Sequence, residues 1–260
     1  MAGIKPTRCL RCSLLPRRFI SIFEKFCGVR IFSPGLRPPR APCILDGMNA
    51  SEEQDAIRIR DFLAELCADL APDFVVIGGW AAYAHGSGQL SLDGDAFISY
   101  PALGTLRDLY EVTPNHRMKK EPFRGPTGHD IDLYVERLHG LAVPFDEAQA
   151  CAQQRGGLLV ICPEHLTILK LKAQAGRRGS GKGDKDALDL IFLWEKGLAD
   201  FEKPELLTTA LEETDWKQLA EIFADKRLTE MACEGNAWEA KAMRGRLAEC
   251  LARARRGERP

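Results

Sequence analysis

The stretch FVVIGGWAAYAHGSGQLSLDGD, residues 74–95, carries the strongest structural pattern in the chain. It begins with four apolar residues, Phe74–Ile77, which predict a short buried strand. Gly78 and Gly79 follow at once and predict a tight turn into a helix that starts at Trp80. The stretch then ends on two aspartates. A strand, a glycine turn, a helix and paired carboxylates, in this order, favour an α/β fold.

The two aspartates, Asp93 and Asp95, fall in a second predicted strand, Leu90–Ser99. Side chains at this spacing point to the same face of a strand, about 7 Å apart. Burying two like charges is costly unless a cation compensates them, and hard carboxylate oxygens suit Mg²⁺ or Mn²⁺. Solvated aspartates are the alternative, and the spacing alone favours that alternative. The glycine turn upstream changes the balance, because backbone N–H groups at a helix start can bind phosphate.

A later predicted strand, Asp130–Val135, repeats the spacing with Asp130 and Asp132. A third carboxylate can therefore enter the same site from a neighbouring strand. Three carboxylates can hold two metal ions about 3.5–4 Å apart. The ordered set is more specific than any one of its members.

Two further helices are predicted over 163–175 and 184–196, with a basic, glycine-rich break between them. Lys170 in the first helix and Lys185 in the second could place positive charge on phosphates. Solvated helix faces are the alternative for both lysines. Two aspartates of the second helix could hold these lysines in place; they are Asp186 and Asp189.

This order of features resembles the DNA polymerase β-like nucleotidyltransferase superfamily, and the detailed sequence looks like its AbiEii-type and related minimal prokaryotic members. The resemblance covers roughly residues 74–194. Val76–Ala81 matches the nucleotide-binding turn of the family, Ser91–Asp95 its metal-binding pair and His129–Val135 its third-carboxylate strand. The most specific match is a helical string in four parts: PEHL at 163–166, LKLKA at 169–173, RRGS at 177–180 and KDALD at 185–189.

The sequence departs from the family pattern beside the aspartates and at the glycine turn. Gly94 and Ala96 stand where the family commonly has larger apolar residues, which predicts a locally loosened strand. Gly79 replaces a serine of the superfamily, so that one hydroxyl contact to phosphate is absent. Neither change removes a metal ligand.

The resemblance implies an enzyme that binds Mg²⁺ or Mn²⁺ and transfers a nucleoside monophosphate from a nucleoside triphosphate, such as ATP, to a protein or RNA acceptor. It implies catalytic and metal-binding roles for Asp93, Asp95 and Asp132, with Asp130 as second choice for the third carboxylate. Nucleotide-binding roles are implied for four residues: Gly78, Gly79, Lys170 and Lys185. The alternative is a non-catalytic nucleotide-binding module of the same fold, or a module that binds an antitoxin in a toxin–antitoxin pair.

A histidine and a basic run are more ambiguous. His85 follows Trp80 on the same predicted helix, and we interpret it as a packing or capping histidine rather than a general base. The basic run lies between the second and third carboxylate strands and would favour an RNA acceptor if it flanks the site; a solvated hairpin is the alternative. Its members are His116, Arg117, Lys119, Lys120 and Arg124.

Residues 1–47 differ from the rest, with nine Lys or Arg, two acidic residues, six prolines and no sustained periodicity. We predict a disordered tail. It could be a transit peptide, a nucleic-acid-binding arm or a stretch upstream of the natural start, and we favour the last, with Met48 as the start. Cys9 and Cys12 lack the second pair that common zinc ribbons need. We expect a nucleotidyltransferase core over 48–200 and a helical region over 201–260.

The composition fits a globular protein. The 260 residues carry a net charge of −1, and 45% of them are hydrophobic. No run approaches the roughly 20 apolar residues of a membrane span, so we expect no membrane partner and a cytoplasmic location. The nine cysteines are scattered, which favours reduced thiols over disulfides. We expect a small mixed sheet with the carboxylates on one face and helices packed on the other.

The boundaries of two other helices can also be proposed from the sequence. The first helix of the core should begin with Ser51 as N-cap and end near Asp69, because its apolar residues follow a helical spacing. A short helix or helical turn is predicted over Thr105–Tyr110.

Overall fold

The computed structural model describes residues 49–260 except 88, 114–119, 127 and 197–200. The predicted tail and Met48 therefore lie outside the described residues, as do Cys9 and Cys12. Three members of the basic run lie outside them as well: His116, Arg117 and Lys119.

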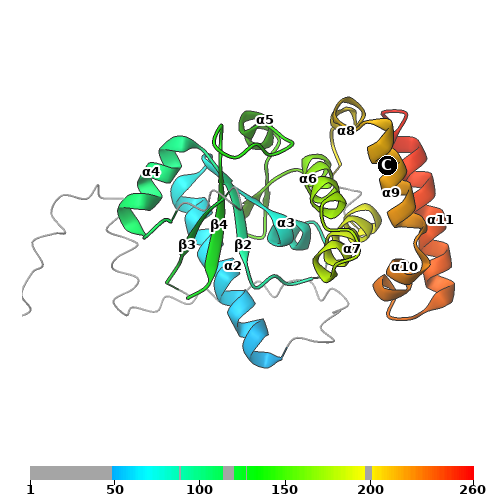
Figure 1. The fold of residues 1–260 in the computed structure, drawn as a ribbon, viewed down its shortest axis with the longest axis horizontal. Coiled ribbons are helices and arrows are strands. Elements are labelled where there is room, and N and C mark those ends of the chain that lie inside the picture. Colours follow the sequence, from blue (N-terminus) through cyan, green and yellow to red (C-terminus); the bar gives the residue numbers. More distant parts are fainter. Residues whose placement is uncertain (1–48, 88, 114–119, 127, 197–200) are drawn as a thin grey trace, which may run out of the picture. The chain divides into compact units, whose positions relative to one another are not determined.

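The described chain alternates strands and helices in its first part and is helical in its second part (Figure 1). The strands are β1 (Phe74–Ile77), β2 (Gly94–Ile98), β3 (Glu121–Arg124), β4 (Asp130–Val135), β5 (Gln153–Arg155) and β6 (Leu158–Val160). The helices among them are α2 (Ala50–Leu70), α3 (Gly78–Ala84), α4 (Tyr100–Leu109) and α5 (Phe145–Ala150). The later helices are α6 (Pro163–Ala175), α7 (Gly181–Lys196), α8 (Glu205–Ala210), α9 (Glu213–Ala224), α10 (Lys226–Ala232) and α11 (Ala237–Ala254).

The strands form one mixed sheet in the order β3-β4-β2-β1-β6-β5. At its centre β1 runs antiparallel to β2, while β2 runs parallel to β4 and β1 parallel to β6. The outer strands β3 and β5 are antiparallel to their neighbours. The predicted fold class, α/β with a small mixed sheet, is confirmed.

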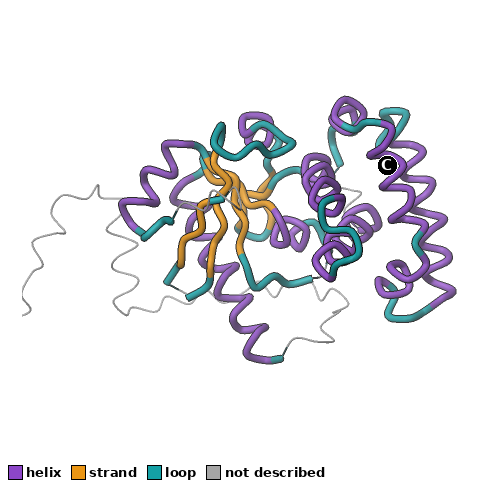
Figure 2. Tube along the Cα trace, viewed as in Figure 1, coloured by secondary structure: helices purple, strands orange, loops and turns teal. Residues whose placement is uncertain are grey.

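Helices lie on both sides of this sheet, including the carboxylate face, rather than on the other face alone as expected (Figure 2). Gly94 marks the face that α2 covers, because a Cβ there would lie 2.6 Å from Cδ1 of Ile131 and 3.3 Å from Leu63 of α2. The missing side chain thus permits close packing of α2, which accounts for the departure from the family pattern at this position. The opposite face carries the carboxylates and meets α3, α6 and α7.

Several helix boundaries differ from the prediction because side-chain caps lie elsewhere. Asn49, not Ser51, caps α2: its Oδ1 accepts from the backbone N–H of Glu52 at 3.1 Å, and Glu52 accepts from the N–H of Asn49 at 2.8 Å. Helix α4 begins at Tyr100, five residues before the predicted start, since Ser99 caps it through Ala102.

The structure also contains elements that the sequence pattern does not predict. Strand β2 is shorter than expected, so Asp93 precedes it in a loop. Helix α5 and strand β5 have six and three residues, too few to show a periodicity. The hairpin of β5 and β6 brings Cys151 to Cys162, and the two form a disulfide where reduced thiols were expected.

One apolar core runs from the sheet into the C-terminal helices. Trp194 of α7 is fully buried, with its ring 5.4 Å from that of Phe201 and 5.3 Å from that of Phe223 of α9. Helices α9, α10 and α11 pack on α7. None of the helices in the described ranges combines the length and the apolar character that crossing a membrane requires.

Candidate functional site

The register of the central strands sets two of the predicted carboxylates side by side. Asp95 and Asp132 are direct partners in the parallel pair of β2 and β4. Paired residues of neighbouring strands project from the same face, so both side chains point toward α3, α6 and α7. Asp95 is also paired with Ile77, the last residue of β1. The two carboxylates therefore lie beside the point where β1 ends and α3 begins.

The turn at that point requires glycine. Gly78 has a φ of 66°, a left-handed conformation that other residues adopt at a cost of about 1–2 kcal/mol. A Cβ on Gly78 would overlap Oδ2 of Asp95. The backbone of Gly78 thus lies directly against the carboxylate.

Asp93 lies in the loop before β2 and is exposed. Its Oδ1 accepts a hydrogen bond of 2.6 Å from the hydroxyl of Ser91. The ammonium of Lys185 donates to the same hydroxyl oxygen at 3.3 Å. A Cβ on Gly79 would lie 2.8 Å from this oxygen and 3.8 Å from Nζ of Lys185. Asp93, Lys185 and the second glycine therefore meet at Ser91.

The two candidates for the third carboxylate have different surroundings. Asp132 is buried and forms an ion pair with Lys120, a member of the basic run. Asp130 is exposed and pairs with Arg124 at 3.2 Å. Asp132 thus occupies the inner position beside Asp95, and Lys120 shows that part of the basic run reaches the carboxylates.

The carboxylates perturb one another. Burial raises the pKa of Asp95 to about 7, and the negative charges of Asp93 and Asp132 add to the effect. Partial desolvation also opposes ionisation of Asp93. The hydrogen bond from Ser91 and the charge of Lys185 outweigh it and hold the pKa of Asp93 below its ordinary value. The site therefore contains a carboxyl group, Asp95, whose ionised form is disfavoured by its surroundings.

A cavity of about 140 Å³ opens beside Asp95. Its apolar wall comes from β1, α6 and the segment after β4: Ile77, Leu141, Leu166, Leu169 and Ala173. Its polar lining includes Tyr134 of β4 and Arg177 from the break between α6 and α7. The cavity thus has an apolar wall with a few polar groups, which is typical of small-molecule sites.

Lys170 also lines this cavity, but its ammonium is held by two aspartates of α7. Nζ lies 2.6 Å from Oδ2 of Asp189 and 3.1 Å from Oδ1 of Asp186. Burial opposes the charge of Lys170, yet the two carboxylates outweigh it and raise its pKa. Arg177 binds the second oxygen of Asp186 at 3.2 Å. The predicted anchoring of Lys170 by both aspartates is confirmed, whereas Lys185 contacts Ser91.

The three aspartates fit a divalent cation in donor type, since carboxylate oxygens are the hard ligands that such ions prefer. In the described part of the chain, however, one group of three ligand-type side chains has its atoms all within 4.8 Å of one another, and it is a different group: Cys151, Cys162 and His165. The three aspartates lie at the same end of the inner strands β2 and β4, but their oxygens are farther apart than the ligand atoms of this group. Lys120 pairs with Asp132, and Ser91 donates a hydrogen bond to Asp93.

Three residues of the site received no role from the sequence: Ser91, Tyr134 and Arg177. Ser91 lies two positions before Asp93, the spacing at which a hydroxyl can bind a nearby carboxylate, but such local bonds are common in loops. His85 behaves as predicted. It is buried, and its Nε2 lies 2.8 Å from the carbonyl oxygen of Ile161.

No family model and no curated protein matches the sequence. Among solved structures, JHP933 from Helicobacter pylori has a TM-score of 0.49 at 13% identity, over 81% of this chain and 95% of that chain. A candidate nucleotidyltransferase from H. pylori gives 0.48 at 13% identity, over 80% and 98%. An antigenic nucleotidyltransferase-like protein from Paracoccidioides brasiliensis gives 0.37 at 15%, over 75% and 93%. Similarity this distant does not by itself assign a function to the chain.

Gly78→Ala tests the turn. We expect it to lower the free energy of unfolding by about 1–2 kcal/mol from the left-handed conformation alone, with an added loss from overlap with Asp95. Chemical denaturation of the two proteins measures the difference. Gly104→Ala is the matched control, because a Cβ at this position in α4 meets nothing within 4 Å. Equal stability of Gly78→Ala and the unchanged protein would contradict the proposed close approach.

Asp95→Asn tests the electrostatics. A pKa raised to about 7 means that the folded state favours the protonated carboxyl. The stability contributed by Asp95 is therefore complete below its unfolded pKa of about 4 and is lost as the pH rises toward 7. With divalent ions removed by EDTA, denaturation between pH 4.5 and 7.5 should show a steeper loss of stability in the unchanged protein than in Asp95→Asn. Parallel curves would show that Asp95 is ionised throughout.

Proposed function

We propose that the chain is a metal-dependent nucleotidyltransferase of the DNA polymerase β-like superfamily, which transfers a nucleoside monophosphate from a nucleoside triphosphate to a protein or RNA hydroxyl. The observation that carries the proposal is the pairing of Asp95 with Asp132 against the backbone of Gly78. Paired carboxylates beside a bare backbone turn suit a cation and a phosphate together. The order of the sequence motifs supports the same activity.

Three carboxylates would hold the cation, namely Asp93, Asp95 and Asp132. The raised pKa of Asp95 supports this assignment, since a divalent cation would supply the missing counter-charge. Mg²⁺ and Mn²⁺ are the ions that such oxygen ligands suit. When bound, the cation would offset the negative charge of the triphosphate.

The remaining residues would bind and orient the nucleotide. Lys185, half-buried beside Ser91 and Gly79, offers a positive charge to the phosphates at the glycine turn. Arg177 offers an exposed guanidinium at the cavity. Lys170 would act on the nucleotide from the cavity wall, where Asp186 and Asp189 fix its ammonium.

The transfer itself is a displacement at phosphorus. The acceptor oxygen forms a bond to the α-phosphorus, and the bond from that phosphorus to the oxygen bridging the α- and β-phosphates breaks. Pyrophosphate leaves, and the hydroxyl proton is released to water. Holding the two reactants in line is the main contribution that the protein can make to such a step.

A second candidate is a nucleotide-binding module without turnover, for example one partner of a toxin–antitoxin pair. The ion pair between Lys120 and Asp132 favours this candidate, because it occupies one of the metal-ligand carboxylates. The two candidates differ in whether binding of a triphosphate with Mg²⁺ leads to transfer.

The double variant Asp93→Asn, Asp95→Asn should abolish nucleotidyl transfer and keep the fold, because it removes charge and changes little volume. Transfer is followed with labelled ribonucleoside triphosphates in Mg²⁺, and folding by circular dichroism. Asp61→Asn on the exposed side of α2 is the matched control and should retain full transfer. Undiminished transfer by the double variant would rule out this site. If a triphosphate with Mg²⁺ stabilises the unchanged protein against heat but no transfer is detected, the result would support the second candidate.

The acceptor class can be identified in the same assay with total cellular RNA and total protein as acceptors. Because Lys120 of the basic run lies at Asp132, we expect RNA to be labelled, with labelling that weakens as salt rises. Replacing Lys119 and Arg124 by Ala should reduce RNA labelling several-fold. Labelling confined to protein, and unchanged by these replacements, would exclude the RNA acceptor.

A further inference from the structure

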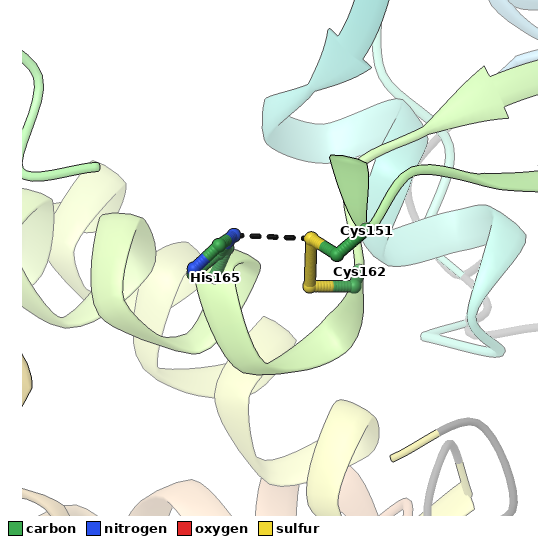
Figure 3. A group of neighbouring side chains, drawn as sticks. All are labelled: Cys151, Cys162 and His165. Carbon is green, nitrogen blue, oxygen red and sulfur yellow. Dashed lines mark hydrogen bonds between the residues drawn. A yellow bond between two sulfur atoms is a disulfide. The ribbon is translucent and has the colours of Figure 1, made fainter. Parts of the chain in front are cut away.

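A second cluster of ligand-type side chains lies where α5, the hairpin of β5 and β6, and α6 meet. Cys151 follows the last residue of α5, Cys162 immediately precedes α6, and His165 lies in the first turn of α6. Figure 3 shows the three side chains converging, with Nδ1 of His165 facing Sγ of Cys151 at 3.1 Å. Cys162 and His165 are buried, whereas Cys151 is half-buried. The cluster is thus formed by the fold but can be reached from one side.

In the structure the two cysteines form a disulfide, which leaves His165 with an unfavourable partner in either neutral form. Its Nδ1 faces the sulfur of Cys151, and its Nε2 lies 3.9 Å from Oε2 of Glu147. A neutral imidazole has one N–H and one lone pair. With the hydrogen on Nε2, the lone pair of Nδ1 faces a sulfur that has no hydrogen. With the hydrogen on Nδ1, the lone pair of Nε2 faces the carboxylate.

A cation among the three ligand atoms removes this mismatch. The lone pair of Nδ1 then faces the cation, and the Nε2–H faces Glu147. Metal-binding histidines commonly donate their second N–H to a carboxylate in this way. A reduced Cys151 could donate its S–H to Nδ1 of His165, but this hydrogen bond would give Cys162 no partner in the cluster.

We propose that Cys151, Cys162 and His165 bind Zn²⁺ when the two cysteines are reduced, and that Glu147 positions the imidazole. Two thiolates and an imidazole are ligands that zinc prefers, and three protein ligands leave a fourth position for water. A thiol or phosphine reductant supplies two electrons and, with water, two protons, which convert the disulfide into two thiols. Zinc then displaces both thiol protons to water.

A zinc ion at this position would link two helices. It would join the end of α5 to the start of α6, the helix that carries Lys170 and part of the cavity wall. An ion that binds the folded chain selectively stabilises that state. This inference does not depend on the proposed function, because none of its residues belongs to the carboxylate site.

The test uses the full chain, reduced with a phosphine without oxygen and then dialysed against Zn²⁺. Native mass spectrometry and elemental analysis should find one zinc ion per chain. The double variant Cys9→Ser, Cys12→Ser should retain it, and so should the matched single control Cys233→Ser. The double variant Cys151→Ser, Cys162→Ser should lose it. Zinc bound only through Cys9 and Cys12, or absent from the reduced chain, would overturn the proposal.

Two further measurements keep the proposal testable if the cysteine variants fail to fold. In the unchanged protein, zinc should protect Cys151 and Cys162 from alkylation relative to EDTA-treated protein, as read by peptide mass spectrometry. Glu147→Gln should weaken zinc binding about 10- to 100-fold without changing the stoichiometry. Equal alkylation with and without zinc, or a pair that re-forms its disulfide in the presence of zinc, would contradict the site.

Discussion

The contact between the backbone of Gly78 and the carboxylate of Asp95 is the constraint on which the site depends. Because Gly78 has no side chain, β1 can turn into α3 directly against β2. The register of β2 with β4 then places Asp132 next to Asp95. Burial and like charge raise the pKa of Asp95, so the same packing that shapes the turn disfavours the ionised form of this carboxyl group.

The charged side chains around these carboxylates form separate groups. Lys120 forms an ion pair with Asp132, and Lys185 reaches Asp93 through the hydroxyl of Ser91. Lys170 is held by two aspartates of α7 and contributes to the cavity wall. Helix α6 lies between the cluster and the cavity wall: Cys162 precedes its first residue, His165 lies in its first turn and Lys170 lies in a later turn.

The sequence predicted long or strongly patterned elements well and short ones poorly. Strands β1 and β4 and helix α6 follow from apolar runs and clear start signals, and their predicted bounds are close to those observed. Helix α5 and strand β5 are too short to show a period, so the meeting of Cys151 with Cys162 was not foreseen. The N-cap of α2 was placed two residues late, because Asn49 and Ser51 both have side chains that can cap a helix.

By itself, the sequence determined the α/β class and the glycine turn and proposed the candidate carboxylates, because these depend on local pattern and on residue chemistry. Only the tertiary structure decided which carboxylates are neighbours, since strand order and register join Asp95 to Asp132 and leave Asp130 exposed. The same holds for Lys185 and Ser91, which are 94 positions apart and meet only in the folded chain. Contacts between distant segments depend on how helices and sheet pack together, and no local pattern in the sequence records that packing.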